Sequence, residues 1–600
     1  MRETEQQIRT PRGYKVCDGI TEAVIYFMVI FTPWAFGTTE NWSIWAANIA
    51  AYMLGGMLVA KWVIRWKTGY APVRWGDSLA AKKEDRGWKM DEGGGREGEG
   101  GRDQGSAVSG QRKGRLEDRG SKIEDGGKEE DSTEDGRRET EGREEVRSQK
   151  SEGRGKGMAK ALTAALASLT VFILAYCLTS ALNARATFYP GTNSFEYHDY
   201  IEWLPHTYDK ESTWQAFWTY MGLAFFFWAT RDWLLGKTSK ERRMSSGESR
   251  EEAQIFQEAN RSLLTSAATI PLGYSAWVPI RAGEASPPPI HIPTRLRRLL
   301  WVMCINGGLL ALEGILQRLD GTGKLLWLVE PHFTKSAEGQ FGPYPYRGSA
   351  AAYLNLVWPV CIGFWLAARK ASARIYPGSR RGGGRSHALL LPSAVVMIAS
   401  PIFSMSRGGA IVAIAQILTA TVILFLATRR EGGLVRAGVL SVFMLTLALT
   451  GYLGWRQLQE RLENTLVDNL NGRLEVYENA KQIAHDFPVL GTGAGSFGSI
   501  YLLYKNPSQA WEAYLHDDWL ETRITFGWVG FIAIFLVLAI TVFRWFIPNG
   551  IKMPWSCVSL LWLSVAGCLV HAKFDFPFQI YSIVFLFLLL CSVLFCVSRR

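Results

Sequence analysis

The chain has 600 residues, of which 48% are hydrophobic and 20% charged, and its net charge is +11 at pH 7. The two classes are segregated, because apolar stretches of membrane-spanning length recur along the chain and one long segment holds much of the charge. This distribution excludes a string of ordinary soluble domains. The positive charge does not require a nucleic-acid partner to explain it, since the cytoplasmic loops of membrane proteins collect Lys and Arg.

The apolar stretches predict an all-α polytopic membrane protein with about twelve transmembrane helices. The polar residues 1–19 lead straight into the first stretch without an evident cleavable signal, so we expect that stretch to act as its own anchor. The predicted spans are 20–36, 44–64, 160–181, 214–234, 298–316, 349–368, 388–404, 408–428, 434–454, 526–547, 556–572 and 579–597.

The loops between these spans alternate in charge. The loop at 369–387 has six basic residues and no acidic one, and "KWVIRWK", "GKTSKERR", "TRREGGLVR" and the terminal "SRR" are similarly basic. Basic loops remain in the cytoplasm, so we place this set and both termini there. The opposite set is expected to face outward: 37–43, 182–213, 317–348, 405–407, 455–525 and 573–578.

Five segments follow from this topology. Residues 1–81 hold an N-terminal tail and two spans. Residues 82–157 mix Gly, Glu, Arg, Asp, Lys and Ser with almost no aliphatic residues, which predicts a disordered cytoplasmic insert. Its composition favours a tolerated insertion over a regulatory element. Residues 158–454 hold spans three to nine, 455–525 form a large periplasmic loop, and 526–600 hold the last three spans.

Ionisable residues beside the spans gather on the outward side. Such residues are costly there, so they normally face a polar cavity and have partners. Arg407 lies in "SMSRGG", and the glycines after it permit close approach of a ligand or another backbone, which favours function over an arginine that only reaches lipid headgroups. Arg473 is the first residue of an amphipathic stretch. A functional role and an ordinary surface charge fit it equally well. Arg347, and His571 with Asp575 in "HAKFDFPFQI", complete this set.

The stretch "YLHDDWLETRITFGW" places one histidine and three carboxylates just before an apolar run. His516 is either a polar cap on that span or a base that accepts a proton from a hydroxyl, a role that suits histidine near neutral pH. On a helix, His516 and Arg523 would share one side, and Asp517 and Glu521 a neighbouring one.

No metal and no cofactor is expected. The histidines lack HExxH or comparable ligand spacing, and the cysteines have neither metal nor disulfide-framework spacing. "GTGAGSFG" has the GxGxxG spacing, but no strand–helix unit surrounds it and the outer compartment lacks nucleotides. We interpret it as a flexible or tight loop, whose N–H groups could still line an anion site.

Several stretches, taken in order, resemble the O-antigen ligase and polymerase family of bacterial inner membranes. They are "SMSRGGAIVAIAQI", "NGRLEVYENAKQIAHDFPVLGTGAGSFGSIY" and "HDDWLETRITFGWVGF", and "PWAFGTTENW", "IEWLPHTYD" and "HAKFDFPFQI" are also similar to stretches of the family. The resemblance covers 20–597 except 82–157. It implies a GT-C-like helical bundle with a large periplasmic loop, and a glycan on an undecaprenyl diphosphate carrier as the substrate.

The resemblance also implies roles for particular residues. The family's diphosphate-binding arginines match Arg407 and Arg473, and its essential loop histidine matches His516. The residue after that histidine is often Asn in the family and is Asp517 here, and Arg347 matches only loosely. Cations would stabilise the departing diphosphate, and the histidine would orient or deprotonate the acceptor hydroxyl. The expected substrate-binding residues are Arg347, Asp517, Glu521, Arg523, His571 and Asp575.

Several functions remain open within this resemblance. A ligase would move a finished glycan onto a lipid A core sugar, a polymerase would join glycan repeats on the carrier, and a third kind of relative would glycosylate protein. The first is the function we expect, with the carrier-linked donor, the acceptor and membrane lipids as partners. A secondary transporter is a different class, and the one-sided clustering of charge and the lack of an internal repeat argue against it.

Overall fold

The computed structural model describes residues 10–76, 132–242, 292–331, 336–375, 385–429, 474–509, 514–547 and 550–598, with the isolated positions 433, 441, 444 and 448. The chain divides into two compact units, one of Met1–Trp75 with Met158–Arg600 and one of Gly76–Gly157.

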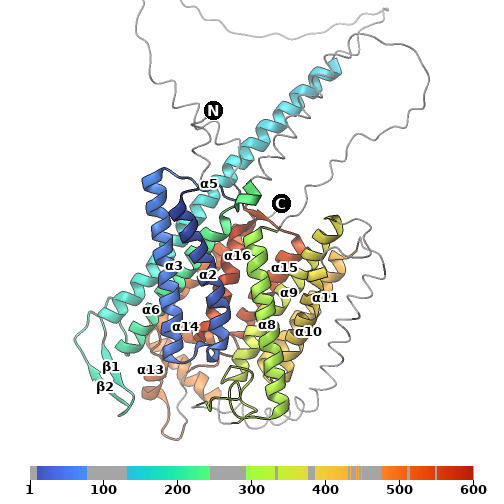
Figure 1. The fold of residues 1–600 in the computed structure, drawn as a ribbon. Coiled ribbons are helices and arrows are strands. Elements are labelled where there is room, and N and C mark those ends of the chain that lie inside the picture. Colours follow the sequence, from blue (N-terminus) through green and yellow to red (C-terminus); the bar gives the residue numbers. More distant parts are fainter. Residues whose placement is uncertain are drawn as a thin grey trace, which may run out of the picture. The chain divides into compact units, whose positions relative to one another are not determined.

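The larger unit is a bundle of helices, and each predicted span except 434–454 coincides with one of them (Figure 1). The span at 434–454 lies outside the described residues, apart from isolated helical positions. The helices are α2 (Arg12–Trp34), α3 (Asn41–Thr68), α5 (Ser132–Leu182), α6 (Lys210–Leu235), α8 (Thr294–Asp320), α9 (Arg347–Ile375), α10 (Leu390–Phe403), α11 (Arg407–Ala427), α13 (Phe497–Tyr504), α14 (Asp518–Trp545), α15 (Trp555–His571) and α16 (Tyr581–Cys596). Short 3-10 turns lie at Phe36–Thr38, Arg385–Leu389 and Pro577–Gln579.

Among the described residues, seven helices are long and apolar enough to cross a membrane: α2, α3, α5 from Gly153, α8, α9, α11 and α14. Three shorter apolar helices, α10, α15 and α16, occupy three further predicted spans. The chain is therefore a polytopic helical membrane protein, as the hydropathy predicts.

Two small sheets depart from the all-α prediction. β1 (Ala186–Tyr189) and β2 (Ser194–Tyr197) form an antiparallel hairpin within the predicted outward loop 182–213. β3 (Ile551–Lys552) pairs in parallel with β4 (Val597–Ser598). Asn193 of the hairpin turn has a φ of 48°, which asparagine adopts more readily than most residues. Strands of two to four residues are too short to give a period that sequence analysis can detect.

The start of α5 also differs from the prediction. Residues 82–157 are predicted to be disordered, but the helix begins at Ser132, so 132–157 have helical backbone. The reason is compositional, because Glu, Arg and Lys are good helix formers even where too little apolar surface exists to build a core. Residues 82–131 lie outside the described residues.

One end of the bundle, where α3 and α6 stop and α8 begins, holds a buried ionic network. Asp232 of α6 accepts hydrogen bonds from Arg65 at 2.8 and 2.9 Å and from Arg74 at 2.5 Å. Lys61, which is 1% exposed, lies 2.8 Å from a carboxylate oxygen of Asp18 on α2. We call this end the basic end. It is the end predicted to be cytoplasmic.

The centre of the bundle is α9, which contacts α8, α10, α11, α15 and α16. Every residue in the 18-residue apolar stretch of α9 is buried, whereas only 17% of the corresponding stretch of α5 is buried. Glycines let α8 approach its neighbours closely: a Cβ at Gly307 would lie 2.9 Å from Val357, and one at Gly308 would lie 2.8 Å from Ser393. The first residues of α9 and α11 are thereby fixed at the end opposite the basic end, which we call the polar end.

Candidate functional site

The turn between α15 and α16 carries the carboxylate around which the polar end is organised. Asp575 is 6% exposed. Its Oδ1 lies 3.1 Å from Nδ1 of His516, and its Oδ2 lies 3.7 Å from Nε2 of His571. The hydroxyl of Tyr346 donates to both oxygens, at 3.3 and 3.2 Å. Three residues that the sequence singled out thus meet at one point, together with one that it did not.

The charge of Asp575 follows from these neighbours. Burial opposes its ionisation, but the hydrogen bond from His516 and the positive charge available at His571 and His516 lower the pKa of Asp575 below its usual range. The group is therefore a carboxylate at neutral pH and accepts hydrogen bonds only. An acceptor at Nδ1 of His516 favours the tautomer that is protonated there, which leaves Nε2 as the basic nitrogen.

Arg347 and Arg407 are the first residues of α9 and α11, and both are half-buried. The side chain of Ser406 caps α11 by accepting a hydrogen bond from the N–H of Gly409 at 3.2 Å. The carbonyl of Gly409 accepts a hydrogen bond from the side chain of Asn355 at 2.9 Å, which ties the two helices together. Two helix N-termini, each opened by an arginine, therefore lie side by side, an arrangement that favours anions.

The glycines that follow these arginines bring the two N-termini against the carboxylate–histidine group. A Cβ at Gly348 would lie only 2.4 Å from Oδ2 of Asp575. A Cβ at Gly408 would lie 3.2 Å from Nε2 of His571. The interpretation that glycine after Arg407 permits close approach is thus supported, and the group approached is another part of the chain.

Arg318 of α8 joins the segments that lead into the two arginines. It donates hydrogen bonds to the carbonyls of Ala337 at 2.6 Å and Ser404 at 2.9 Å, with further bonds to the neighbouring Glu338 and Phe403. One segment precedes Arg347 and the other precedes Arg407. Sequence analysis missed Arg318, although an arginine at the outward end of a span runs against the usual charge asymmetry and could have drawn attention.

The segment before α14 is held by its carboxylates. Asp517 caps α14 by accepting a hydrogen bond from the N–H of Leu520 at 3.2 Å, and it pairs with Lys573. Because α14 begins at Asp518, His516 precedes the helix, and the prediction that it shares a helical side with Arg523 is wrong. His516 is oriented by the turn 572–579 instead of by a helix.

Two further carboxylates have structural partners. Asp518, 1% exposed, accepts hydrogen bonds from the N–H of Phe578 at 2.7 Å and from Gln579 at 3.2 Å. Glu521, 3% exposed, accepts one from the N–H of Leu515 at 2.8 Å. These bonds fasten both sides of the segment that carries the histidine.

Arg523 has a different environment, with its guanidinium carbon 4.2 Å from the centre of the Trp528 ring. The expected substrate-binding roles of Asp517, Glu521 and Arg523 stay predictions.

Arg473 lies outside the described residues, but the stretch that follows it is helical from 474 to 486. As the amphipathic pattern predicts, this helix has an apolar face. Ala480 and Ile483 are fully buried and belong to one cluster with Phe497 of α13. The face therefore rests on protein and not on the bilayer.

The glycine-rich loop is engaged with a break in α14. Gly527 has a φ of 59° and interrupts the helix. The N–H groups of Thr492 and Gly493 donate to the carbonyls of Ile524 and Thr525, which the break leaves available. These hydrogen bonds fit the interpretation as a tight loop. They also occupy two N–H donors that an anion site in this loop would need.

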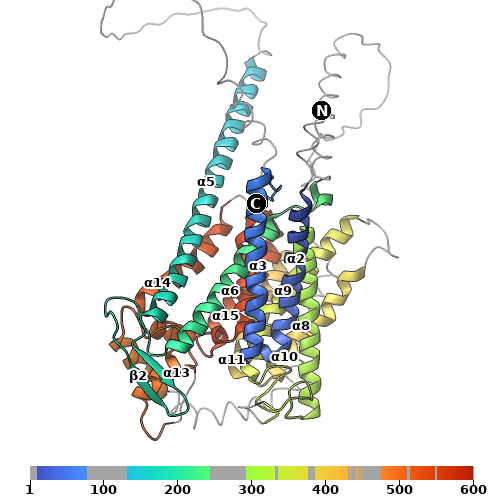
Figure 2. The ribbon, with the colours of Figure 1, turned by 60° about the vertical axis from the view of Figure 1, so that its left-hand side comes forward.

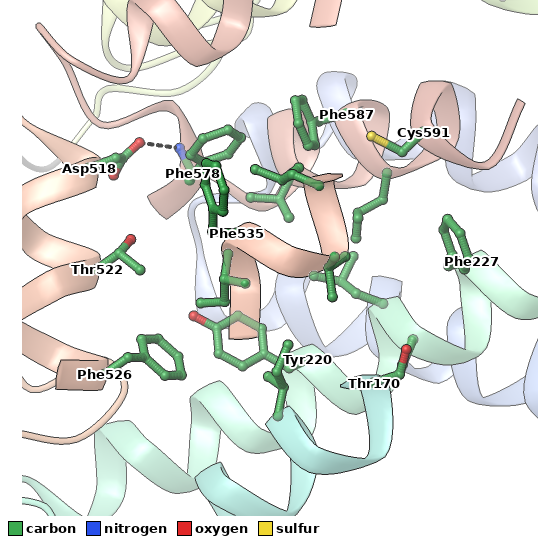
Figure 3. A pocket seen from close by; sticks show the side chains of 18 of the residues that line it. Thr170, Tyr220, Phe227, Asp518, Thr522, Phe526, Phe535, Phe578, Phe587 and Cys591 are labelled. Carbon is green, nitrogen blue, oxygen red and sulfur yellow. Dashed lines mark hydrogen bonds between the residues drawn. The ribbon is translucent and has the colours of Figure 1, made fainter. Parts of the chain in front are cut away.

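A cavity of about 280 Å³ lies between α5, α6, α14 and α16. Figure 3 shows Asp518 and Thr522 on one side of it, with Phe227, Phe587 and Cys591 farther along. Asp518 and Glu521 line one end, and Asp518 also contacts the turn that carries Asp575 through Phe578 and Gln579. Within the described ranges, no group of three or more His, Cys, Asp or Glu is placed to hold a metal ion.

Comparison with known proteins identifies one family. Residues 392–535 match the family model described as O-antigen ligase, which confirms the resemblance for the motifs within this range. The matched range contains Arg407 and His516 and ends before His571 and Asp575. No curated protein matches the chain.

Proposed function

We propose, from the match of residues 392–535 to the O-antigen ligase family, that the chain is a membrane glycosyltransferase. It moves a glycan from an undecaprenyl diphosphate carrier to an acceptor hydroxyl at the periplasmic face of the bacterial inner membrane. Its two termini and its basic end face the cytoplasm, consistent with the charge of the loops. The observation that carries the proposal is that Asp575 orients His516 and, together with His571, lies against two helix N-termini that begin with arginine.

The arginines serve the leaving group. In the transfer, the bond between the sugar's anomeric carbon and the phosphate oxygen breaks, and negative charge grows on the diphosphate. Arg347 and Arg407 stabilise that charge, and an arginine fork matches a phosphate bidentately. Arg473 joins them from the periplasmic loop by the resemblance. A diphosphate is already a good leaving group, so the proposed reaction requires neither a metal ion nor a nucleotide.

His516 serves the acceptor. Its Nε2 takes the proton of the acceptor hydroxyl while that oxygen forms the new bond to the anomeric carbon. Asp575 holds Nδ1 and stabilises the imidazolium that results, and Tyr346 and His571 hold Asp575. The protonated histidine then releases its proton to water.

The acceptor we propose is a lipid A core sugar, which makes the enzyme a ligase. The same arrangement of groups serves a polymerase, whose acceptor is another carrier-linked glycan, and a protein O-glycosyltransferase. Deleting the gene and separating extracted polysaccharides on a gel distinguishes the first two. Loss of capped lipopolysaccharide with retained carrier-linked chains supports the ligase, whereas a single-repeat product supports the polymerase.

The direct test uses the purified full-length protein with carrier-linked glycan and acceptor lipid, without nucleotide and with a chelator. We expect transfer, and we expect His516→Ala to slow it about a hundred- to a thousand-fold with donor binding nearly unchanged. Loss of activity on chelation contradicts the metal-free reaction. Normal turnover by His516→Ala would show that the histidine is only a polar cap on its span.

The sidedness has a test of its own. Single cysteines introduced in 474–509 should react with an impermeant reagent in intact spheroplasts, and cysteines introduced in 82–157 should not. The reverse labelling would place the site in the cytoplasm and contradict the proposed reaction.

A further inference from the structure

The cavity between α5, α6, α14 and α16 is apolar over most of its length and opens at the side of the bundle. Its lining includes Leu166, Phe227 and Leu588, and also Phe535, whose side chain is 57% exposed. The flanking helices α5 and α14 have only 17% and 28% of their apolar windows buried. Figure 2 shows α5 and α14 beside the bundle, and Figure 3 shows Thr170 of α5 with Phe526 and Phe535 of α14 around the cavity. Such a space suits a hydrocarbon chain.

One helical turn beyond the cavity, toward the basic end, each of the four helices contributes a residue to a connected group that we call the arginine cap: Thr163, Arg231, Arg544 and Phe595. Each lies three or four positions from a lining residue, namely Leu166, Trp228, Thr541 and Cys591.

Direct contacts connect the members of the arginine cap. Arg231 donates a hydrogen bond to the hydroxyl of Thr163 at 3.2 Å. The guanidinium carbons of Arg231 and Arg544 lie 5.4 and 5.8 Å from the centre of the Phe595 ring. Two positive groups therefore share one aromatic ring, one helical turn beyond the cavity toward the basic end.

Arg231 of the arginine cap carries a charge and a donor that its neighbours do not use fully. Asp232 follows Arg231 in α6, but it accepts its hydrogen bonds from Arg65 and Arg74. Within the part of the chain that the structure describes, Nε of Arg231 is buried and has no hydrogen-bond partner. A phosphate would meet both needs, because arginine binds it through charge-assisted and often paired hydrogen bonds.

The two ends of the cavity differ in charge. Asp518 and Glu521 line the far end, at 1% and 3% exposure. The described residues that line this end offer no cation to an anionic headgroup, and the two carboxyl groups accept hydrogen bonds from the backbone N–H groups of Phe578 and Leu515. The arginine cap therefore sets the orientation of the occupant, with its phosphate at the basic end and its chain directed toward the polar end.

We propose that this cavity holds an acyl chain of an anionic diacyl phospholipid of the inner leaflet, whose phosphate binds Arg231 and Arg544. The lipid fills the space between the main bundle and the two sparsely packed helices. The phosphate site lies at the basic end, away from Asp575 and His516, and its assignment to the inner leaflet rests on the proposed sidedness.

The test begins with the full-length protein purified in mild detergent, whose retained lipids are extracted and identified by mass spectrometry. We expect about one anionic phospholipid per chain. The variant Arg231→Gln with Arg544→Gln should lose it by at least about tenfold, because two charge-assisted contacts disappear. Arg298→Gln is the matched control, since Arg298 lies on α8 near the basic end, is 58% exposed and pairs with Glu22.

A second measurement uses delipidated protein and two lipids with identical oleoyl chains. Dioleoyl phosphatidylglycerol should raise the melting temperature of the wild type and of Arg298→Gln, and dioleoyl phosphatidylcholine should raise it less. The double variant should lose this preference.

A charge-neutral variant keeps the proposal falsifiable if the double variant does not fold. Ala224→Phe fills the cavity from α6 and should also release the lipid. Unchanged lipid retention in either variant overturns the proposal. Equal stabilisation by the two lipids, or purification with a polyisoprenoid phosphate in place of a phospholipid, overturns it as well.

Discussion

The half of the bundle around α9 and the side formed by α5 and α14 are built differently. The apolar window of α9 is entirely buried, and glycines bring α8 against it. Only 28% of the apolar stretch of α14 is buried, and Gly527 breaks this helix. Arg347 and Arg407 therefore stand on the rigid half, whereas His516 precedes a helix at the open side. The site depends on the hydrogen bonds that hold the histidine's segment to the turn 572–579.

The largest effect should come from breaking the join between the two regions at Asp575. In the Asp575→Asn variant, the amide can present an N–H to Nδ1 of His516 and favour the wrong tautomer. We expect kcat to fall by about 10³- to 10⁴-fold. Donor KM should change little, which steady-state kinetics with carrier-linked glycan would measure. A loss confined to KM would show that Asp575 binds the donor instead.

A somewhat smaller loss should follow from a change on the rigid half. Arg407→Lys retains the charge but replaces a bidentate fork by a point charge. Transfer should slow by about a hundred- to a thousand-fold, or roughly 2–4 kcal/mol of transition-state stabilisation. Arg298→Lys, near the basic end, is the matched control and should transfer normally. Full activity of Arg407→Lys would remove this residue from the leaving-group site.

The positioning role of Arg318 predicts a third, milder effect. Arg318→Gln removes most of the bonds to the carbonyls of Ala337 and Ser404, so both arginine segments should loosen. We expect about a ten- to hundred-fold loss in kcat/KM, because small misplacements of catalytic groups are costly. A purely structural role would lower the melting temperature and leave the kinetics of the folded protein intact. Measuring both quantities on the same preparation separates these outcomes.

The smallest effects should appear in stability and should contrast the two regions directly. Leu356→Ala leaves a cavity in the fully buried α9 and should cost about 2–4 kcal/mol. Phe535→Ala, on the exposed side of α14, should cost less than about 1 kcal/mol in lipid-free detergent. Denaturant unfolding of the two variants gives the comparison. Similar losses would mean that the open side is packed more firmly than its burial indicates.

Much of the site was predictable because its signals are local. The span positions follow from runs of apolar residues, and Arg407 and His516 stand out as ionisable groups at span ends. The apolar face of 474–486 follows from its helical period, and the structure shows what it rests on.

Other assignments needed the fold. Tyr346 has no unusual sequence context, and the position of Arg318 at the outward end of a span does not reveal the carbonyls that it binds. Asp518 and Glu521 resemble site residues although they bind backbone N–H groups.

The sequence by itself determined that the chain crosses a membrane, where its spans lie, and that its polar residues gather beside particular spans. Hydropathy and charge asymmetry act residue by residue along the chain, so they can be detected without a fold. Only the tertiary structure decided that His516 meets Asp575, 59 positions away, and that Asp575 and His571 lie against the first turns of α9 and α11. Those meetings depend on which helices pack together, and packing is a property of side-chain shape in three dimensions that no period of the sequence records.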